Sequence, residues 1–154
     1  MGAAVLRLAV AAAFIGHGAQ KLFGLWGGAG LDGTAAQFAL LGLSPPAILA
    51  LVFGVVELGG GVLVALGAYT SWVAPVLALD PLVFVWKVHI HNGFFLNWDL
   101  TPGVGHGVEH HLLLVAALIA LAFTGGGAIS VDAWRHRSAE AAAAGLARIR
   151  AGKV

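Results

Sequence analysis

The sequence contains no cysteine, which excludes disulfide bonds, thiolate metal ligands and any relay of thiols. It has a single methionine, so any metal would have to be bound by histidine and carboxylate side chains. Charged residues are scarce as well: they make up 10% of the chain, whereas soluble domains have about a quarter. With 60% hydrophobic residues, the composition predicts a membrane protein.

The 154 residues leave room for one domain, and four apolar blocks of about twenty residues each would fill most of it. The chain therefore predicts an all-α integral membrane bundle of four transmembrane helices. We assign residues 1–131 to this domain, with spans at about residues 3–24, 45–67, 71–91 and 108–124. The first block is expected to be a span and not a cleaved signal peptide, because it reaches spanning length and lacks a clean small-residue cleavage site.

The connections between the spans have their own signals. The glycine-rich stretch after the first span carries a short helical pattern that includes Phe38 and Leu41, and it predicts an interfacial helix. Pro75 and Pro81 predict a kink in the third span. The three glycines from Gly125 onward end the fourth span.

After the fourth span, residues 132–154 form a basic, alanine-rich tail that predicts a helix capped by Ser130. Five of the eight lysines and arginines lie in this tail, so the positive-inside rule predicts that both termini lie in the cytoplasm. The tail either binds anionic lipid headgroups, docks a partner protein, or only fixes the topology. Nucleic acid is not an expected partner, because the cations are few and no aromatic residues lie between them. The tail cations are Arg135, Arg137, Arg148, Arg150 and Lys153.

Two spans carry a polar stripe. In the first, His17, Gln20 and Lys21 recur at helical spacing, and in the third, Asp80 and Lys87 are followed by His91 on the same helical face. A charged side chain at the centre of a bilayer costs about 2.5–3.5 kcal/mol, so these residues need either a partner or a function.

The depth of these residues suggests two clusters. In the deeper one, Glu57 and Asp80 approach each other near the middle of the membrane and form a proton relay, with Arg7 reaching toward one of them. The alternative is a polar clasp that only holds helices together. The glycines around Glu57, such as Gly60 and Gly61, allow close packing within one bundle or between copies in a homo-oligomer.

The second cluster gathers toward the outer side and lines a pocket that suits a quinone, because its side chains can donate hydrogen bonds to carbonyl oxygens and move protons. The alternative is that the lysines extend to the interface and the histidines are simply hydrated. The predicted ligand-binding residues are His17, Gln20, Lys21, Lys87, His91, Glu109 and His110.

Other cofactors find less support in the sequence. Pairing of His17 with His91 or His110 would be needed to hold a haem axially, and the adjacent His110 and His111 point about 100° apart on a helix. No dense spacing of metal ligands and no flavin or nicotinamide motif occurs, so we expect neither haem, metal, flavin nor nicotinamide. His89 lies off the polar stripe and is interpreted as a packing residue.

Taken in order, several short patterns resemble the DoxX family of membrane proteins over about residues 6–132. The patterns are Arg7, residues 16–18 and 21–24, residues 31–46, residues 54–61 around Glu57, residues 88–95, Glu109 and residues 125–132. Asp80, Lys87 and the His110–His111 pair are not part of that pattern. The resemblance implies four transmembrane helices in a bacterial or archaeal cytoplasmic membrane. It also implies a link to redox chemistry, because some relatives are associated with thiosulfate:quinone oxidoreductases and others with complexes that handle oxidative stress.

These inferences lead to one functional hypothesis and two alternatives. The leading hypothesis is a redox-associated membrane subunit that binds quinone or a similar lipophilic carrier and receives electrons from a partner redox protein. The first alternative is a non-catalytic scaffold that binds partner proteins, and the second is a carrier for protons or a small anion that uses Glu57 and Asp80.

Overall fold

A computed structural model describes residues 1–152, and this part of the chain is helical with no strand. Lys153, the last cation of the predicted tail, lies outside the described residues. The helices, with two 3₁₀ turns (η1, η3) and one π-helical turn (η2), are α1 (Gly2–Phe23), η1 (Leu25–Gly27), α2 (Gly30–Leu40), α3 (Pro46–Leu66), α4 (Thr70–Phe84), η2 (Val85–His89), η3 (Ile90–Asn92), α5 (Glu109–Thr124) and α6 (Val131–Ala151).

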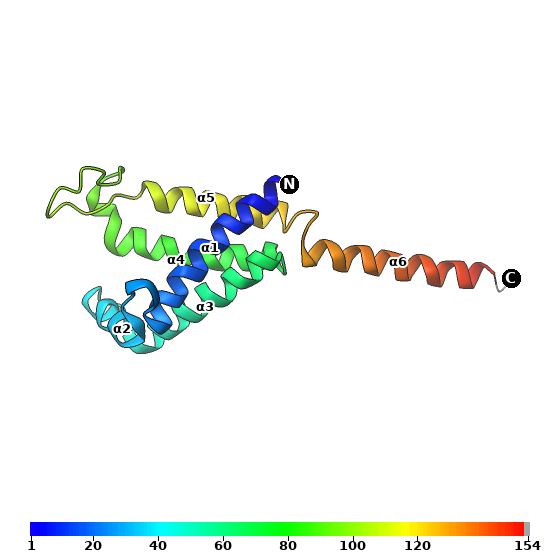
Figure 1. The fold of residues 1–154 in the computed structure, drawn as a ribbon, viewed down its shortest axis with the longest axis horizontal. Helices are drawn as coiled ribbons and strands as arrows, with labels where there is room; N and C mark the ends of the chain where they lie inside the picture. Colours follow the sequence, from blue (N-terminus) through cyan, green and yellow to red (C-terminus); the bar gives the residue numbers. More distant parts are fainter. Residues whose placement is uncertain (153–154) are drawn as a thin grey trace.

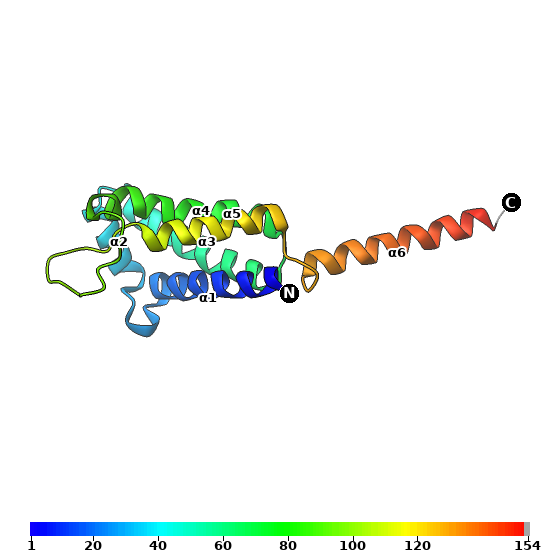
Figure 2. The ribbon, with the colours of Figure 1, turned by 90° about the horizontal axis from the view of Figure 1, so that it is seen from above.

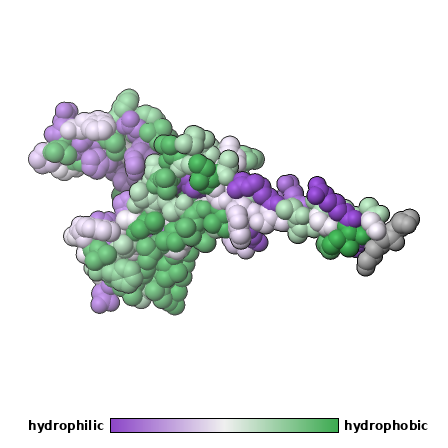
Figure 3. Space-filling model, turned by 45° about the vertical axis from the view of Figure 1, so that its right-hand side comes forward, coloured by the Kyte–Doolittle hydropathy of each residue, from purple (hydrophilic) through white to green (hydrophobic). Residues whose placement is uncertain are grey.

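Four apolar helices, α1, α3, α4 and α5, form an up-and-down bundle (Figures 1 and 2). The N-terminus and the start of α6 lie at one end of the bundle, here called the termini end, and α2 and the long loop of residues 93–108 lie at the other, the loop end. Figure 3 shows a hydrophobic surface over the bundle and hydrophilic groups on the long loop and on α6. The predicted all-α membrane bundle, with a short helix after the first span and a helix at the C-terminus, is confirmed.

Three helical stretches are long and apolar enough to cross a membrane: Gly2–Phe23, Pro46–Leu66 and Thr70–Asn92. The fourth helix, α5, is apolar but has only 16 residues, fewer than the ~20 that a typical span requires. It packs along α4, and Leu118 and Leu121 on α5 are fully buried in the core together with Leu77 of α4. The first two helices of the bundle in sequence, α1 and α3, are likewise each other's main partner.

Glycines allow α1 and α3 to approach closely. A methyl group added at Gly18 of α1 would lie 2.5 Å from the backbone nitrogen of Leu58 in α3. One added at Gly61 of α3 would lie 2.9 Å from Ile15 of α1. These small residues bring the two backbones close enough for the polar side chains between them to pair directly.

The third span departs from a regular helix in a way that matters for the site. Pro75 and Pro81 lie inside α4, which continues past both of them. The irregularity comes later, where the π turn η2 and the 3₁₀ turn η3 follow Phe84. A π turn adds a residue to the helical turn and a 3₁₀ turn removes part of one, so side chains beyond Phe84 leave the face they would occupy on a regular α-helix.

Arg7 corrects one prediction. It was expected to reach toward Glu57 or Asp80, but its guanidinium points to the termini end, where it donates to the carbonyl oxygens of Gly126 and, at 2.9 Å, Ile129. Arg7 is 5% exposed, and these carbonyls lie in the turn after α5, where no helix supplies them with donors. The guanidinium therefore holds the α5–α6 turn against α1.

Asp132 completes the same junction. Its carboxylate accepts hydrogen bonds from the backbone N–H groups of Tyr69 (2.9 Å) and Thr70 (3.0 Å) and so caps the start of α4. Ser130 caps α6, as predicted, because its hydroxyl accepts from the N–H of Ala133 at 3.0 Å. Beyond this junction α6 leaves the bundle along its long axis, and none of its residues is buried (Figure 1).

We predict that Gly18→Ala destabilises the bundle by about 1–3 kcal/mol, because the added methyl group meets the backbone of α3 and the helices must move apart. The matched control is Gly16→Ala on the same helix, where nothing lies within 4 Å of the new methyl group. Thermal unfolding in detergent micelles should give a lower midpoint for Gly18→Ala, and an equal or higher one for Gly16→Ala, since alanine favours a helix. Equal midpoints for the two variants would contradict the close packing of α1 on α3.

Candidate functional site

A pocket of about 310 Å³ lies at the loop end, between the last turns of α1, the following glycine-rich turn, α2 and α4. Its position follows from the chain reversal after α1, where Gly24 ends the helix with a φ of 69° and α2 folds back over the bundle. The lining residues are His17, Gln20, Lys21, Gly27, Gly28, Ala29, Thr34, Gln37, Phe38 and Phe84.

The two sides of this pocket differ in chemistry. The polar side carries an imidazole, two amides and an ammonium group, from His17, Gln20, Gln37 and Lys21. The other side is aromatic: Phe38 is 1% exposed, and its ring centroid lies 6.0 Å from that of Phe84. Such a pocket can hold a flat apolar ring and offer hydrogen-bond donors to polar atoms at the edge of that ring.

Lys21 links the pocket to the interior of the bundle. Its ammonium nitrogen lies 2.6 and 2.8 Å from the two carboxylate oxygens of Glu57 on α3, in the one ion pair that residues 1–152 contain. The side chains are 16% and 1% exposed, so the pair is nearly removed from solvent. The same nitrogen lies 5.4 Å from the centroid of the Phe84 ring, a further contact that favours its charge.

Asp80 stands beside this pair. It is close enough to Glu57 and to His17 to interact with both electrostatically, and its Oδ1 atom is buried without a hydrogen-bond partner among the described residues. Lys21 pairs with Glu57 alone, so Asp80 has no ion-pair partner among the described residues. The cluster of Lys21, Glu57 and Asp80 carries a charge of −1 when both carboxyl groups are ionised. We refer to these three residues as the charged cluster.

The two clusters that the sequence predicted separately are in contact in the structure. Lys21 was assigned to an outer pocket and Glu57 to a deeper cluster, but Lys21 lines the pocket and binds Glu57 at once. Of the seven predicted ligand-binding residues, His17, Gln20 and Lys21 line this pocket.

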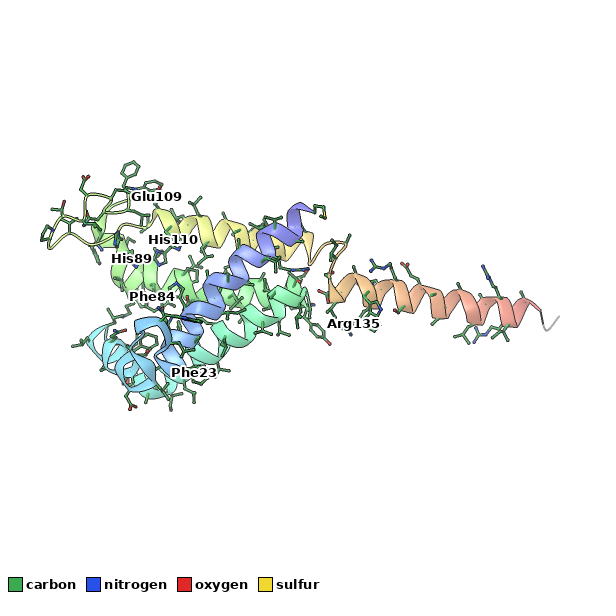
Figure 4. All side chains as sticks on the ribbon, viewed as in Figure 1. Phe23, Phe84, His89, Glu109, His110 and Arg135 are labelled. Carbon is green, nitrogen blue, oxygen red and sulfur yellow. The ribbon has the colours of Figure 1, made fainter. Side chains whose placement is uncertain are left out.

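The other four predicted ligand-binding residues do not line the pocket. Lys87 lies over the ring of its neighbour Trp86, at 4.3 Å from the centroid, and His91 is exposed in η3. Glu109 accepts a hydrogen bond from the backbone N–H of Leu96 at 3.1 Å and so anchors the long loop, while His110 is exposed. Figure 4 shows Glu109 and His110 at the start of α5 beside this loop.

The physical reason for this difference is the π turn. The predicted stripe assumed a regular α-helix through Asp80, Phe84, Lys87 and His91. Because η2 begins at Val85, only the first two of these residues keep their place beside α1, and the later ones rotate away.

Sequence reasoning missed the contribution of α2. Thr34, Gln37 and Phe38 line the pocket from this helix, and the hydroxyl of Thr34 approaches the carbonyl oxygen of Lys21 at 3.5 Å. Their spacing of three and four residues matches that of His17, Gln20 and Lys21, and this was the available signal.

A group of histidines at the loop end was also missed. His89 stacks on His111 with ring centroids 4.2 Å apart, and its Nδ1 atom lies 2.7 Å from the carbonyl oxygen of His106. His89 was interpreted as a packing residue, and its contacts are with other histidines. In residues 1–152, histidine and carboxylate side chains do not gather in groups of three or more that could hold a metal ion.

Comparison with known proteins identifies the family. The family model described as DoxX matches residues 2–90 of this chain. The chain belongs to the DoxX family. The matched range contains every residue that lines the pocket and the whole charged cluster, so this site is part of the family's region of the chain.

Two curated relatives agree with this identification. This DoxX protein is 30% identical over 132 residues to the inner membrane protein YphA of Escherichia coli strain K12, which covers 83% of this chain and 86% of the relative. It is also 30% identical over 132 residues to the putative oxidoreductase CatD of Bacillus subtilis strain 168, with 86% and 85% covered. No solved structure matches the chain.

The ion pair yields a stability prediction for this DoxX protein. Lys21→Met leaves the buried carboxylate of Glu57 without its partner and should lower the free energy of unfolding by about 3–5 kcal/mol at alkaline pH, where that carboxyl group is ionised. Adding Glu57→Gln to that variant should restore most of the loss, because no unpaired charge then remains at position 57. The loss in the single variant should also shrink as the pH is lowered, since a proton on Glu57 removes the unpaired charge.

The measurement is unfolding of the micellar protein at several pH values. Lys87→Met serves as the matched control, because it removes a lysine from the same end of the bundle that forms no ion pair in the described part of the chain. If Lys21→Met is as stable as Lys87→Met at every pH tested, the Lys21–Glu57 pair does not exist in the native bundle.

Proposed function

We propose that this DoxX protein is a redox-associated membrane subunit that binds the head group of a quinone in the pocket at the loop end. The observation that carries the proposal is the pairing of an aromatic wall, Phe38 and Phe84, with a row of hydrogen-bond donors that leads directly into the charged cluster. A quinone head group is a flat ring with carbonyl oxygens at its edge, so it matches both sides of such a pocket.

The residues present fit that ligand. The imidazole of His17 and the amides of Gln20 and Gln37 can donate to carbonyl oxygens, and Phe38 and Phe84 can cover the ring. Behind them, the buried Oδ1 atom of Asp80 has an unused capacity for a hydrogen bond or a proton. The volume of about 310 Å³ suits one head group, with its isoprenoid tail in the lipid.

A quinone takes up two electrons and two protons when it is reduced, and this chain supplies groups for the protons only. His17 faces the pocket and interacts with Asp80, so it can pass a proton between the ligand and the charged cluster. Lys21 keeps Glu57 in place and balances part of its charge. The electrons come from a partner redox protein, because the chain has no cysteine and no flavin or nicotinamide motif.

The relatives support this assignment in outline. One is named a putative oxidoreductase and the other an inner membrane protein. We place this protein in the bacterial inner membrane with the termini end in the cytoplasm, since Arg135, Arg137, Arg148 and Arg150 all lie on α6 beyond that end. The quinone pocket then faces the outer leaflet.

A second candidate function is that of a scaffold that recruits other proteins. One observation favours it: α6 has 21 residues, and none of them is buried against the bundle. The two functions differ in what accompanies the gently purified protein. A quinone band in the ultraviolet spectrum favours the first, and a stoichiometric protein without any small molecule favours the second.

The direct test is the affinity for a short-chain quinone, measured by isothermal titration in micelles. We expect His17→Phe and Gln37→Leu each to weaken binding by about threefold to tenfold, the effect of one lost hydrogen bond. His91→Phe is the matched control, because this exposed histidine lies at the same end of the bundle but outside the pocket. Unchanged affinity in both pocket variants, or an equal loss in His91→Phe, would rule out this binding site.

A further inference from the structure

A second and larger cavity, of about 740 Å³, lies at the termini end and is not part of the quinone proposal. It is formed where the start of α4, the glycine turn after α5 and the first turns of α6 meet. Because α4 and α5 are apolar helices of the bundle and α6 lies outside it, this cavity is at the level of the membrane surface. Its lining residues are Tyr69, Ser71, Trp72, Thr124, Gly125, Gly126, Gly127, Ala128, Ser130, Asp132, Ala133, Arg135, His136 and Ala139.

The lining of this cavity contains one arginine that could bind an anion. Arg135 and His136 line the cavity, and Arg135 forms no ion pair in the described part of the chain. Its guanidinium is held 4.8 Å from the centroid of the Tyr69 ring, an arrangement that leaves the N–H groups at its edge free to bind an anion. The one carboxylate in the lining, Asp132, already accepts from two backbone N–H groups.

The glycine turn offers further donors. The N–H groups of Gly126, Gly127 and Ala128 donate to no protein atom in the described residues. The carbonyl oxygens of the same residues are already taken, by Arg7, Ser130 and Arg137 respectively. A turn whose acceptors are occupied and whose donors are free is suited to an anion.

The surroundings of the cavity point to a lipid as the source of that anion. Trp72 lines the cavity and is 80% exposed, and Trp134, on the first turn of α6, is 62% exposed. Tryptophan is favoured at the boundary between acyl chains and headgroups. The anion expected at this depth is therefore the phosphate of a phospholipid headgroup.

We propose that this cavity is a binding site for the phosphate of an anionic phospholipid headgroup, with Arg135 as its main charged contact. The first turns of α6 then form the binding site together with the bundle. The far end of the helix takes no part, because Arg148 and Arg150 lie more than three turns further along a helix that leaves the bundle.

The test uses the full-length protein in nanodiscs of mixed phosphatidylglycerol and phosphatidylcholine, with retained lipids counted by native mass spectrometry. In the wild type we expect phosphatidylglycerol to be enriched over phosphatidylcholine. Arg135→Gln should reduce that enrichment by about fivefold, the ratio that corresponds to about 1 kcal/mol for one basic residue at a membrane surface. Arg148→Gln, which removes the same charge from the same helix, should leave it unchanged.

A second pair of variants keeps the proposal testable if Arg135→Gln disturbs the contact with Tyr69. Ala139→Asp places a negative charge in the lining, and Ala143→Asp places the same charge one turn further along, outside it. The first should reduce the enrichment and the second should not. No enrichment in the wild type, or equal losses in Arg135→Gln and Arg148→Gln, would overturn the proposal. Inorganic phosphate that displaces the bound phosphatidylglycerol at equal concentration would show that the site takes free phosphate and not a lipid.

Discussion

The bidentate ion pair between Lys21 and Glu57 is the interaction on which the rest of the site depends. It requires α1 and α3 to lie very close together, and Gly54, one turn before Glu57, leaves the space in which Leu22 and the stem of Lys21 pack. With Lys21 directed inward, Gln20 and His17 on the same helical face are directed to the pocket. The glycines of these two helices therefore allow a short distance between the helices, and the ion pair forms across that distance.

Much of the fold could be predicted from the sequence, because apolar helices in a bilayer must satisfy their own backbone and leave few alternatives. The four apolar blocks, the short helix between the first two, and the cap at Ser130 were all visible in composition and spacing. The predicted partner of Arg7 was wrong, because a buried guanidinium can bind either carboxylates or backbone carbonyl oxygens. Carboxylates are easily recognised in a sequence, whereas unpaired carbonyl oxygens at the end of a helix appear only when the turn is formed.

The candidate site could be predicted about as far as regular helical geometry extends. His17, Gln20 and Lys21 lie on an uninterrupted helix, and their common face follows from their spacing. Lys87 lies within a π turn and His91 follows it, and no single residue type marks such a turn, so regular helical spacing does not describe where these two residues lie. The aromatic wall came partly from α2, whose position depends on how the chain folds back after Gly24 and not on any local pattern.

The direction of α6 determines how far from the membrane its charges act. A helix of 21 residues extends about 30 Å, whereas electrostatic attraction in physiological salt fades over about 8 Å. If the termini end lies at the membrane surface, as we propose, the arginines of the first turns of α6 lie within the field of the lipid headgroups, and those of its last turns lie beyond it. The arginines of this one helix would then lie in two environments, the membrane surface and the aqueous phase. Arg148 and Arg150 would be in the aqueous phase.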